Sequence, residues 1–149
     1  MPNELNILVA EDDPNDVDLL KKAMARAQVT NPVHFVKDGQ EAIDYLRGCG
    51  QYADRSKFPF PQVVISDLKM PRLNGLELLD WLHRHPECKV IPTVLLSGSG
   101  ITGDVEKAYR FGANSYFQKP SGLEELTALM RVLHRYWCAS EIPFLVHNC

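Results

Sequence analysis

The stretch QVVISDLKMP, residues 62–71, decides the fold predicted for this chain. It begins with a run of β-branched apolar residues, Val63 to Ile65, which is typical of a strand buried on both faces. One serine then separates this run from Asp67. A carboxylate is costly inside a sheet, so its place at the C-terminal tip predicts a parallel strand whose end faces water.

Apolar blocks of this kind alternate with amphipathic stretches along the chain. The predicted strands are residues 5–10, 32–36, 62–67, 91–97 and 115–118. Strands that alternate with helices of this length predict right-handed crossovers and a parallel sheet covered on both faces. We therefore predict an α/β fold, a flavodoxin-like doubly wound (βα)5 domain with strand order 2-1-3-4-5.

The intervening helices are predicted from apolar residues at helical spacing. Asp13 suits the N-cap of the first helix and Pro14 its first position. A later helix is predicted to begin near Asn74, and a long final helix spans 121–137. Residues 48–61 contain glycines and prolines without a clear period and are predicted to form an exposed loop. The apolar positions assigned to the helices are Val17, Leu20, Met24, Ala27, Ala42, Ile43, Leu46, Leu76, Leu79, Leu82, Val105, Ala108 and Phe111.

Composition limits the classes of function. The chain has 149 residues and a formal net charge of -3, with no basic cluster, which argues against nucleic acid as a partner. No apolar run is long enough for a membrane span, and the N-terminus has no secretory pattern. Four cysteines without a C-x-x-C pair are predicted to be free thiols of a cytoplasmic protein.

Polar side chains follow the predicted strands at their C-terminal ends. Glu11 and Asp12 follow the first strand, Asp67 ends the third, Ser97 ends the fourth and Lys119 follows the fifth. Carboxyl ends of parallel strands meet at one edge of a sheet, where ligands bind. Converging carboxylates repel one another, and Mg²⁺, which shares phosphate oxygens readily, relieves that repulsion. The edge is therefore predicted to be a Mg²⁺-dependent phosphoryl-transfer site.

The same blocks carry a resemblance to a known family. ILVAEDD, VVISDLKMPRLNG, VLLSG and GANSYFQKP, in this order and spacing, resemble the signature blocks of receiver domains in two-component response regulators. The resemblance extends from about residue 5 to residue 137 and divides the chain into a receiver domain, 1–137, and a C-terminal extension, 138–149.

The resemblance implies a role for each site residue. Asp67 would accept phosphate from a sensor histidine kinase, and Lys119 would pair with the acceptor and then with the phosphoryl group, its bond to Pro120 being cis. Ser97 would be the switch hydroxyl and Tyr116 the switch aromatic. The implied Mg²⁺ ligands are the carboxylates of Asp12 and Asp67, the backbone carbonyl of Lys69 and, through a bound water, Glu11.

Other functions compete with this interpretation. An aspartyl-phosphate phosphatase also uses an aspartate after a strand, but it needs a general acid two residues further on, where this chain has Lys69. A receiver-like interaction module that does not turn over phosphate is a further alternative. The stretch GSGITG, residues 98–103, matches a dinucleotide fingerprint by letter but follows the fourth strand instead of the first.

The final helix and the loops suggest partners. Beside an apolar stripe suited to the core, Leu129, Val132 and Tyr136 form a second row, which predicts a homodimer surface or, alternatively, a wide core face. No DNA-binding or catalytic domain follows residue 137 in this sequence, so output through protein contacts is expected. The long loop before residue 63 and the ending RYWCASEIPF are similar to single-domain regulators that pair with bacterial phytochrome histidine kinases.

Overall fold

The computed structural model describes residues 4–98 and 101–144. Its strands form one parallel sheet with the order β2-β1-β3-β4-β5, so the predicted topology is confirmed. The strands are β1 (Ile7–Ala10), β2 (Val33–Val36), β3 (Val63–Ser66), β4 (Thr93–Ser97) and β5 (Ser115–Gln118).

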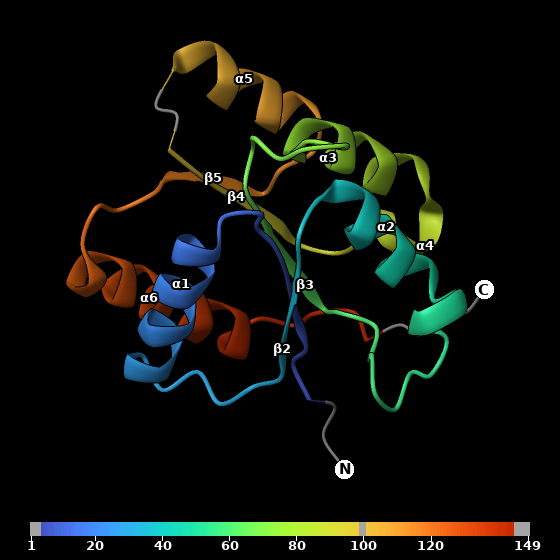
Figure 1. Cartoon of the computed structure of the whole chain (residues 1–149), viewed down its shortest axis with the longest axis horizontal. Helices are drawn as coiled ribbons and strands as arrows, with labels where there is room; N and C mark the ends of the chain where they lie inside the picture. The colour runs from blue at the N-terminus through green and yellow to red at the C-terminus, as the bar shows by residue number, and fades with distance from the viewer. Residues whose placement is uncertain (1–3, 99–100, 145–149) are drawn as a thin grey trace.

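Helices cover both faces of the sheet. Figure 1 shows α1 and α6 together on one side, with α2, α3, α4 and α5 on the other. The helices are α1 (Pro14–Arg26), α2 (Gly39–Arg47), α3 (Gly75–Arg84), α4 (Pro86–Lys89), α5 (Thr102–Arg110) and α6 (Leu123–Ala139), with a short 3₁₀ turn, η1 (Gly50–Tyr52).

Strand β3 lies at the centre of the sheet and is buried along its whole length. Side chains alternate between the faces of a strand, so Val63 and Ile65 join the core beneath α1 and α6. Val64, between them, joins the core beneath α2 and α3. The apolar run of β3 is thus explained because its side chains fill hydrophobic cores on both faces of the sheet. Asp67, which follows this strand, lies at the sheet edge where the polar side chains gather.

Capping residues fix where two of the site-bearing helices begin. The side chain of Asp13 accepts a hydrogen bond from the backbone N–H of Asn15, and Pro14 occupies the first turn, as predicted. Asn74 and Glu77 form a reciprocal capping box at the start of α3.

The loop 48–61 has more internal structure than its composition suggests. The guanidinium of Arg55 donates hydrogen bonds to the carbonyls of Tyr45 and Leu46 in the last turn of α2, and to that of Phe58. The carbonyl of Tyr45 also accepts the N–H of Gly48, so at the end of α2 Arg55 adds a second donor for Tyr45 and supplies one for Leu46, where the helix itself provides no further N–H groups.

Several local predictions need correction. The short helix α4 was not predicted, and α6 continues two residues beyond 137, to Ala139. Phe111 follows α5 and is exposed, and Leu78 is more deeply buried than Leu76. Leu78 packs in the core that includes residues of α2, whereas Leu76, on another side of α3, is partly exposed and packs against the smaller core of Leu79 and Leu95.

The cysteines also differ from prediction in one case. Cys88 and Cys138 are free thiols, as predicted. Cys49 is disulfide-bonded, so the prediction is wrong for this residue. The spacing of cysteines along the sequence does not show which of them form bridges, and Cys149 lies outside the described residues.

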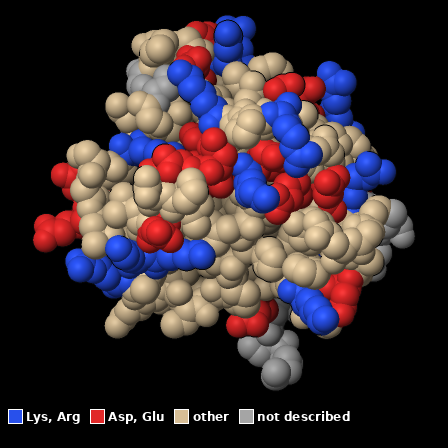
Figure 2. All heavy atoms as spheres, viewed as in Figure 1, with Lys and Arg blue, Asp and Glu red and all other residues tan. Residues whose placement is uncertain are grey.

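Charged side chains of both signs are interspersed over the face shown in Figure 2. Within the described part of the chain, no helix has the length and apolar character needed to cross a membrane.

Candidate functional site

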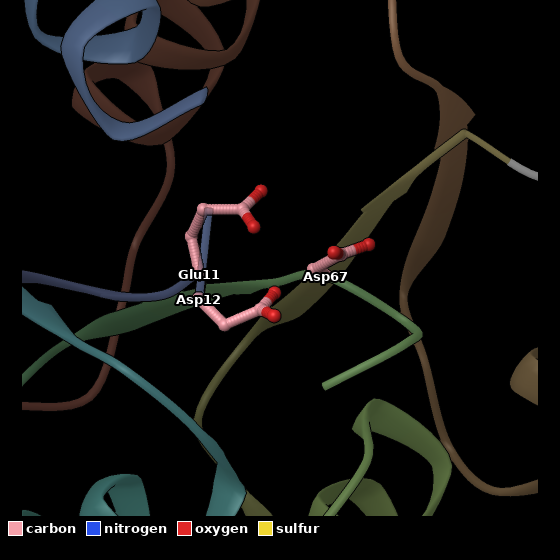
Figure 3. A group of neighbouring side chains, drawn as sticks. All are labelled: Glu11, Asp12 and Asp67. Carbon is pink, nitrogen blue, oxygen red and sulfur yellow. The ribbon is translucent and has the colours of Figure 1, made fainter. Parts of the chain in front are cut away.

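Three carboxylates meet where β1 and β3 end. Ala10 pairs with Ser66 in the sheet, so the residues that follow these two positions leave the sheet side by side. One carboxylate oxygen each of Glu11, Asp12 and Asp67 lies within 4.8 Å of the others. Figure 3 shows the three side chains around one space above the strand ends. The predicted convergence is therefore present in the structure.

Backbone hydrogen bonds hold Asp67 in place. Its N–H donates to the carbonyl of Ala10 at 2.9 Å, which extends the sheet by one residue. Its carboxylate accepts a hydrogen bond from the N–H of Leu68 at 2.7 Å. With 11% of the side chain exposed, Asp67 is shielded but remains open to a small reactant.

Lys119 reaches this cluster from the end of β5. Its backbone N–H donates to the carbonyl of Ser97 at 2.7 Å, which ties it to β4. Its ammonium lies 2.5 Å from Glu11 Oε1 and 3.5 Å from Asp67 Oδ2. The sequence prediction that Lys119 and the carboxylates belong to one site agrees with this arrangement.

A fourth carboxylate was missed by sequence reasoning. Asp16, in the first turn of α1, accepts a hydrogen bond from Lys119 Nζ at 2.8 Å. The sequence signal was an acidic residue just after the first strand. An acidic residue in a first helical turn also has an ordinary explanation in the helix dipole, so that signal alone did not indicate a contact with Lys119.

Burial and charge shift the pKa values of these groups. Burial raises the pKa of Glu11 to about 7. The hydrogen bond from Lys119 opposes this rise, and the negative charge of Asp67 adds to it. Burial likewise raises the pKa of Asp67, while Lys119 opposes the rise. Burial alone would lower the pKa of the Lys119 ammonium, but hydrogen bonds to Asp16 and Glu11 raise it above its usual value. Burial thus disfavours the charged form of both buried carboxylates, and Lys119 partly offsets this effect.

This donor set fits a divalent cation. Mg²⁺ binds through one or two protein carboxylates and keeps several waters. Asp12 is exposed and points into the shared space with Asp67, which suits direct ligation (Figure 3). Buried Glu11 is already bonded to Lys119, which suits a role through water. The participation of the Lys69 carbonyl stays a prediction.

The loop between β3 and α3 forms one wall of the site. Arg72 donates two hydrogen bonds to the carboxylate of Asp38, at 2.8 and 3.1 Å. The N–H of Gly39 donates to the carbonyl of Leu73 at 3.0 Å. The start of α2 therefore holds the loop that carries Lys69.

The two switch candidates lie on neighbouring strands. Ser97 is buried at the end of β4, and Tyr116 is half-buried in β5, where it packs against the small core that includes Leu95 and Ala108. Their switching roles remain predictions.

The predicted cis bond before Pro120 is wrong. The bond is trans, as are the other peptide bonds of the described residues. For an X–Pro bond the two forms differ by only about 0.5–1 kcal/mol, so surrounding contacts decide between them. Lys119 reaches the carboxylates with the bond in the trans form.

The predicted dimer residues share one side of α6. Val132 and Tyr136 are 63% and 66% exposed, whereas Leu129 is half-buried and packs against the core. The buried stripe of α6 includes Leu126, Met130, Leu133 and Trp137. The second row is therefore mostly outside the core, although its role as a dimer surface stays a prediction.

Comparison with known proteins identifies the class. The family model of the response regulator receiver domain matches residues 7–131, and the chain belongs to this family. The family consists of two-component signalling proteins. Among curated proteins, the chain is 33% identical to the probable methanogenesis regulatory protein FilR2 of Methanothrix harundinacea, over 88% of this chain and 82% of that protein.

Solved structures of light-signalling regulators are similar throughout. Response regulator RPA3017, from red light signalling of R. palustris, is 32% identical with a TM-score of 0.90, over 95% of this chain and 99% of that one. The phosphorylated cyanobacterial phytochrome response regulator RcpA is 31% identical with a TM-score of 0.86, with the same coverage. The Mn²⁺-bound form of response regulator Rcp1 is 26% identical with a TM-score of 0.82, over 93% and 99%. Phytochrome-associated regulators are thus among the structural neighbours of this chain.

Proposed function

We propose that this chain is a response regulator that accepts a phosphoryl group on Asp67 from a sensor histidine kinase and signals through protein contacts. The observation that carries the proposal is the carboxylate group of Glu11, Asp12 and Asp67 within 4.8 Å, with the Lys119 ammonium 3.5 Å from Asp67. A nucleophile, a set of cation ligands and a cation for the phosphoryl oxygens are thus in one place.

The chemistry needs little more than alignment and charge neutralisation. A carboxylate oxygen of Asp67 attacks the phosphorus, a P–O bond forms, and the P–N bond of the phosphohistidine donor breaks. Phosphoryl transfer has a loose transition state with charge spread over the phosphoryl oxygens. Asp12, Asp67, the Lys69 carbonyl and, through water, Glu11 would hold Mg²⁺, which supplies the charge that stabilises these oxygens.

Residues around Asp67 would carry the signal away from the acceptor. The phosphoryl group adds about 1.5 to 2 negative charges, which attract the ammonium of Lys119 and the hydroxyl of Ser97. Ser97 lies on the strand next to Tyr116, so movement at Ser97 would change the space that this aromatic ring fills. The face formed by α5, β5 and α6 would change shape in response.

The proposed kinase is of the bacteriophytochrome type. Two of the similar structures, RPA3017 and RcpA, come from light signalling and cover 99% of their own length in the comparison. The long loop before β3 and the aromatic and proline residues near the C-terminus, noted in the sequence, support the same assignment.

We also propose a homodimer through α6. Val132 and Tyr136 are large apolar side chains with most of their surface exposed, and Leu129 adjoins them. Exposed apolar residues of this size on one helix suit a contact with a second copy. Light scattering on wild type and on Tyr136→Glu tests the dimer: the wild type is expected at twice the mass of the variant.

The first test of the function is the intact mass after incubation with Mg²⁺ and acetyl phosphate, with Asp67→Asn beside the wild type. We expect one added phosphoryl group on wild type, absent in the variant and abolished by EDTA. A short-lived adduct is distinguished by binding of beryllofluoride, a stable phosphoryl mimic. If the wild type neither gains mass nor binds beryllofluoride, the interaction module replaces the phosphoacceptor as the best hypothesis.

A further inference from the structure

We propose that Asp16 is a positioning residue that holds Lys119 away from Asp67 until the phosphoryl group is in place. The inference rests on the proposed function, since it concerns how the same site is controlled. Asp16 belongs neither to the three-carboxylate group nor to the residues predicted from the sequence.

The distances around the lysine are unequal. Lys119 Nζ lies 2.5 Å from Glu11 and 2.8 Å from Asp16, but 3.5 Å from the acceptor Asp67. The first two are hydrogen-bonding distances, and the third is longer than such a bond. An ammonium has three protons, and two of them are directed to carboxylates on the β1 and α1 side of the site.

Asp16 and Glu11 hold the lysine in different ways. The side chain of Glu11 is 2% exposed, so breaking its bond to Lys119 would leave a carboxylate with little access to water. The side chain of Asp16 is 37% exposed, so water can replace the lysine there. When Lys119 turns toward a phosphoryl group, the bond to Asp16 is therefore the one that opens.

This difference gives Asp16 a definite effect on the acceptor. In the resting protein it competes with Asp67 for the ammonium, which leaves the acceptor carboxylate less neutralised. In the phosphorylated protein Lys119 must break its hydrogen bond with Asp16, which reduces the free energy gained from the contact between Lys119 and the phosphoryl group. Removing the Asp16 charge should therefore favour the phosphorylated form of the site.

Asp16→Asn tests this with a matched control. Asp18 is an exposed aspartate on the same helix, so Asp18→Asn makes the same change of charge without touching the lysine. Asp16→Glu keeps the charge and serves as the conservative variant. The measurement is the dissociation constant for beryllofluoride in saturating Mg²⁺, together with the melting temperature of each variant.

We expect Asp16→Asn to bind beryllofluoride about two- to five-fold more tightly, the range for releasing a partly exposed ion pair. Asp18→Asn and Asp16→Glu are expected to stay near the wild-type value. A purely structural role at the helix start would lower the melting temperature and leave the beryllofluoride affinity unchanged. Equal or weaker binding by Asp16→Asn, relative to Asp18→Asn, would overturn the proposal.

A crystal structure of Asp16→Asn without Mg²⁺ or a phosphoryl mimic provides a separate readout. We expect the 3.5 Å separation between Lys119 Nζ and Asp67 Oδ2 to shorten to about 3 Å, a hydrogen bond. An unchanged or longer distance contradicts the positioning role. This readout does not depend on phosphoryl transfer, so failure of the wild type to accept phosphate would overturn the proposed function and leave this test intact.

Discussion

Gly75, the first residue of α3, lies against the backbone of Asp67, the proposed phosphoacceptor. A Cβ atom at this position would stand 2.3 Å from the carbonyl oxygen of Asp67 and 3.0 Å from the Cα of Leu68. Both neighbours are backbone atoms, so neither can turn aside as a flexible side chain would. The main chain at the end of β3 would have to move by about 1 Å to restore an ordinary contact, a change of the kind that destabilises packed interiors.

We expect Gly75→Ala to lower the free energy of unfolding by about 1–3 kcal/mol. Gly103, near the start of α5, provides the matched control, because a Cβ there meets nothing within 4 Å. Gly103→Ala is expected to raise the free energy of unfolding by about 0.5–1 kcal/mol, because alanine is the better helix former.

Urea unfolding of both variants and the wild type, followed by circular dichroism, gives the two differences directly. The variant at Gly75 should also accept phosphate from acetyl phosphate more slowly, since the main chain of Asp67 must shift. If Gly75→Ala proves as stable as the wild type, within about 0.5 kcal/mol, the close approach of α3 to β3 does not limit this site as argued.

Two further predictions concern Asp38, which forms an ion pair with Arg72 beside the site, and Arg55, which binds the end of α2. Burial alone would raise the pKa of Asp38, but hydrogen bonds from Arg72 and from the N–H of Glu41 lower this pKa below its usual value. The ionised carboxylate of Asp38 therefore stabilises the fold fully above about pH 4, the pKa of an unfolded aspartate. This stabilisation is lost as the pH falls through the lower pKa of the folded state. Asp38→Asn should therefore lower the free energy of unfolding at pH 7 and reduce its fall between about pH 5 and pH 2, and an unchanged acid dependence would contradict this. Arg55→Met should cost about 1–3 kcal/mol in urea unfolding, because the carbonyls of Leu46 and Phe58 lose the Arg55 donor and that of Tyr45 keeps only the N–H of Gly48. Arg84→Met, which removes an exposed ion pair, should cost less than about 0.5 kcal/mol.

The sheet was predictable because its strands are short apolar runs that end in polar residues. In QVVISD, burial on both faces and the carboxylate at the tip both follow from the letters. The parallel sheet followed from the alternation of strands and helices, the strand order followed from the flavodoxin-like class that five such units fit, and the structure confirms both. The convergence of Glu11, Asp12 and Asp67 followed in turn, since parallel strands end at a common edge.

Features that depend on side-chain reach were not predictable in this way. Arg55 stands in a stretch of glycines and prolines, and nothing in the letters shows that it extends to the end of α2. The pairing of Asp38 with Arg72 joins residues from two loops far apart in the chain. Such contacts depend on the direction of long side chains after the backbone is in place.

Asp16 combines both situations. Its position in the first turn of α1 is readable from the sequence, and so is the reason for an acidic residue there. Its contact with Lys119 requires α1 to begin close to the end of β1, where Asp13 caps it, and requires β5, which is separated from β1 by β3 and β4, to end on the same edge of the sheet. The shared strand edge therefore brings the proposed phosphoacceptor set together, while the first turn of α1 places one further carboxylate, that of Asp16, against Lys119.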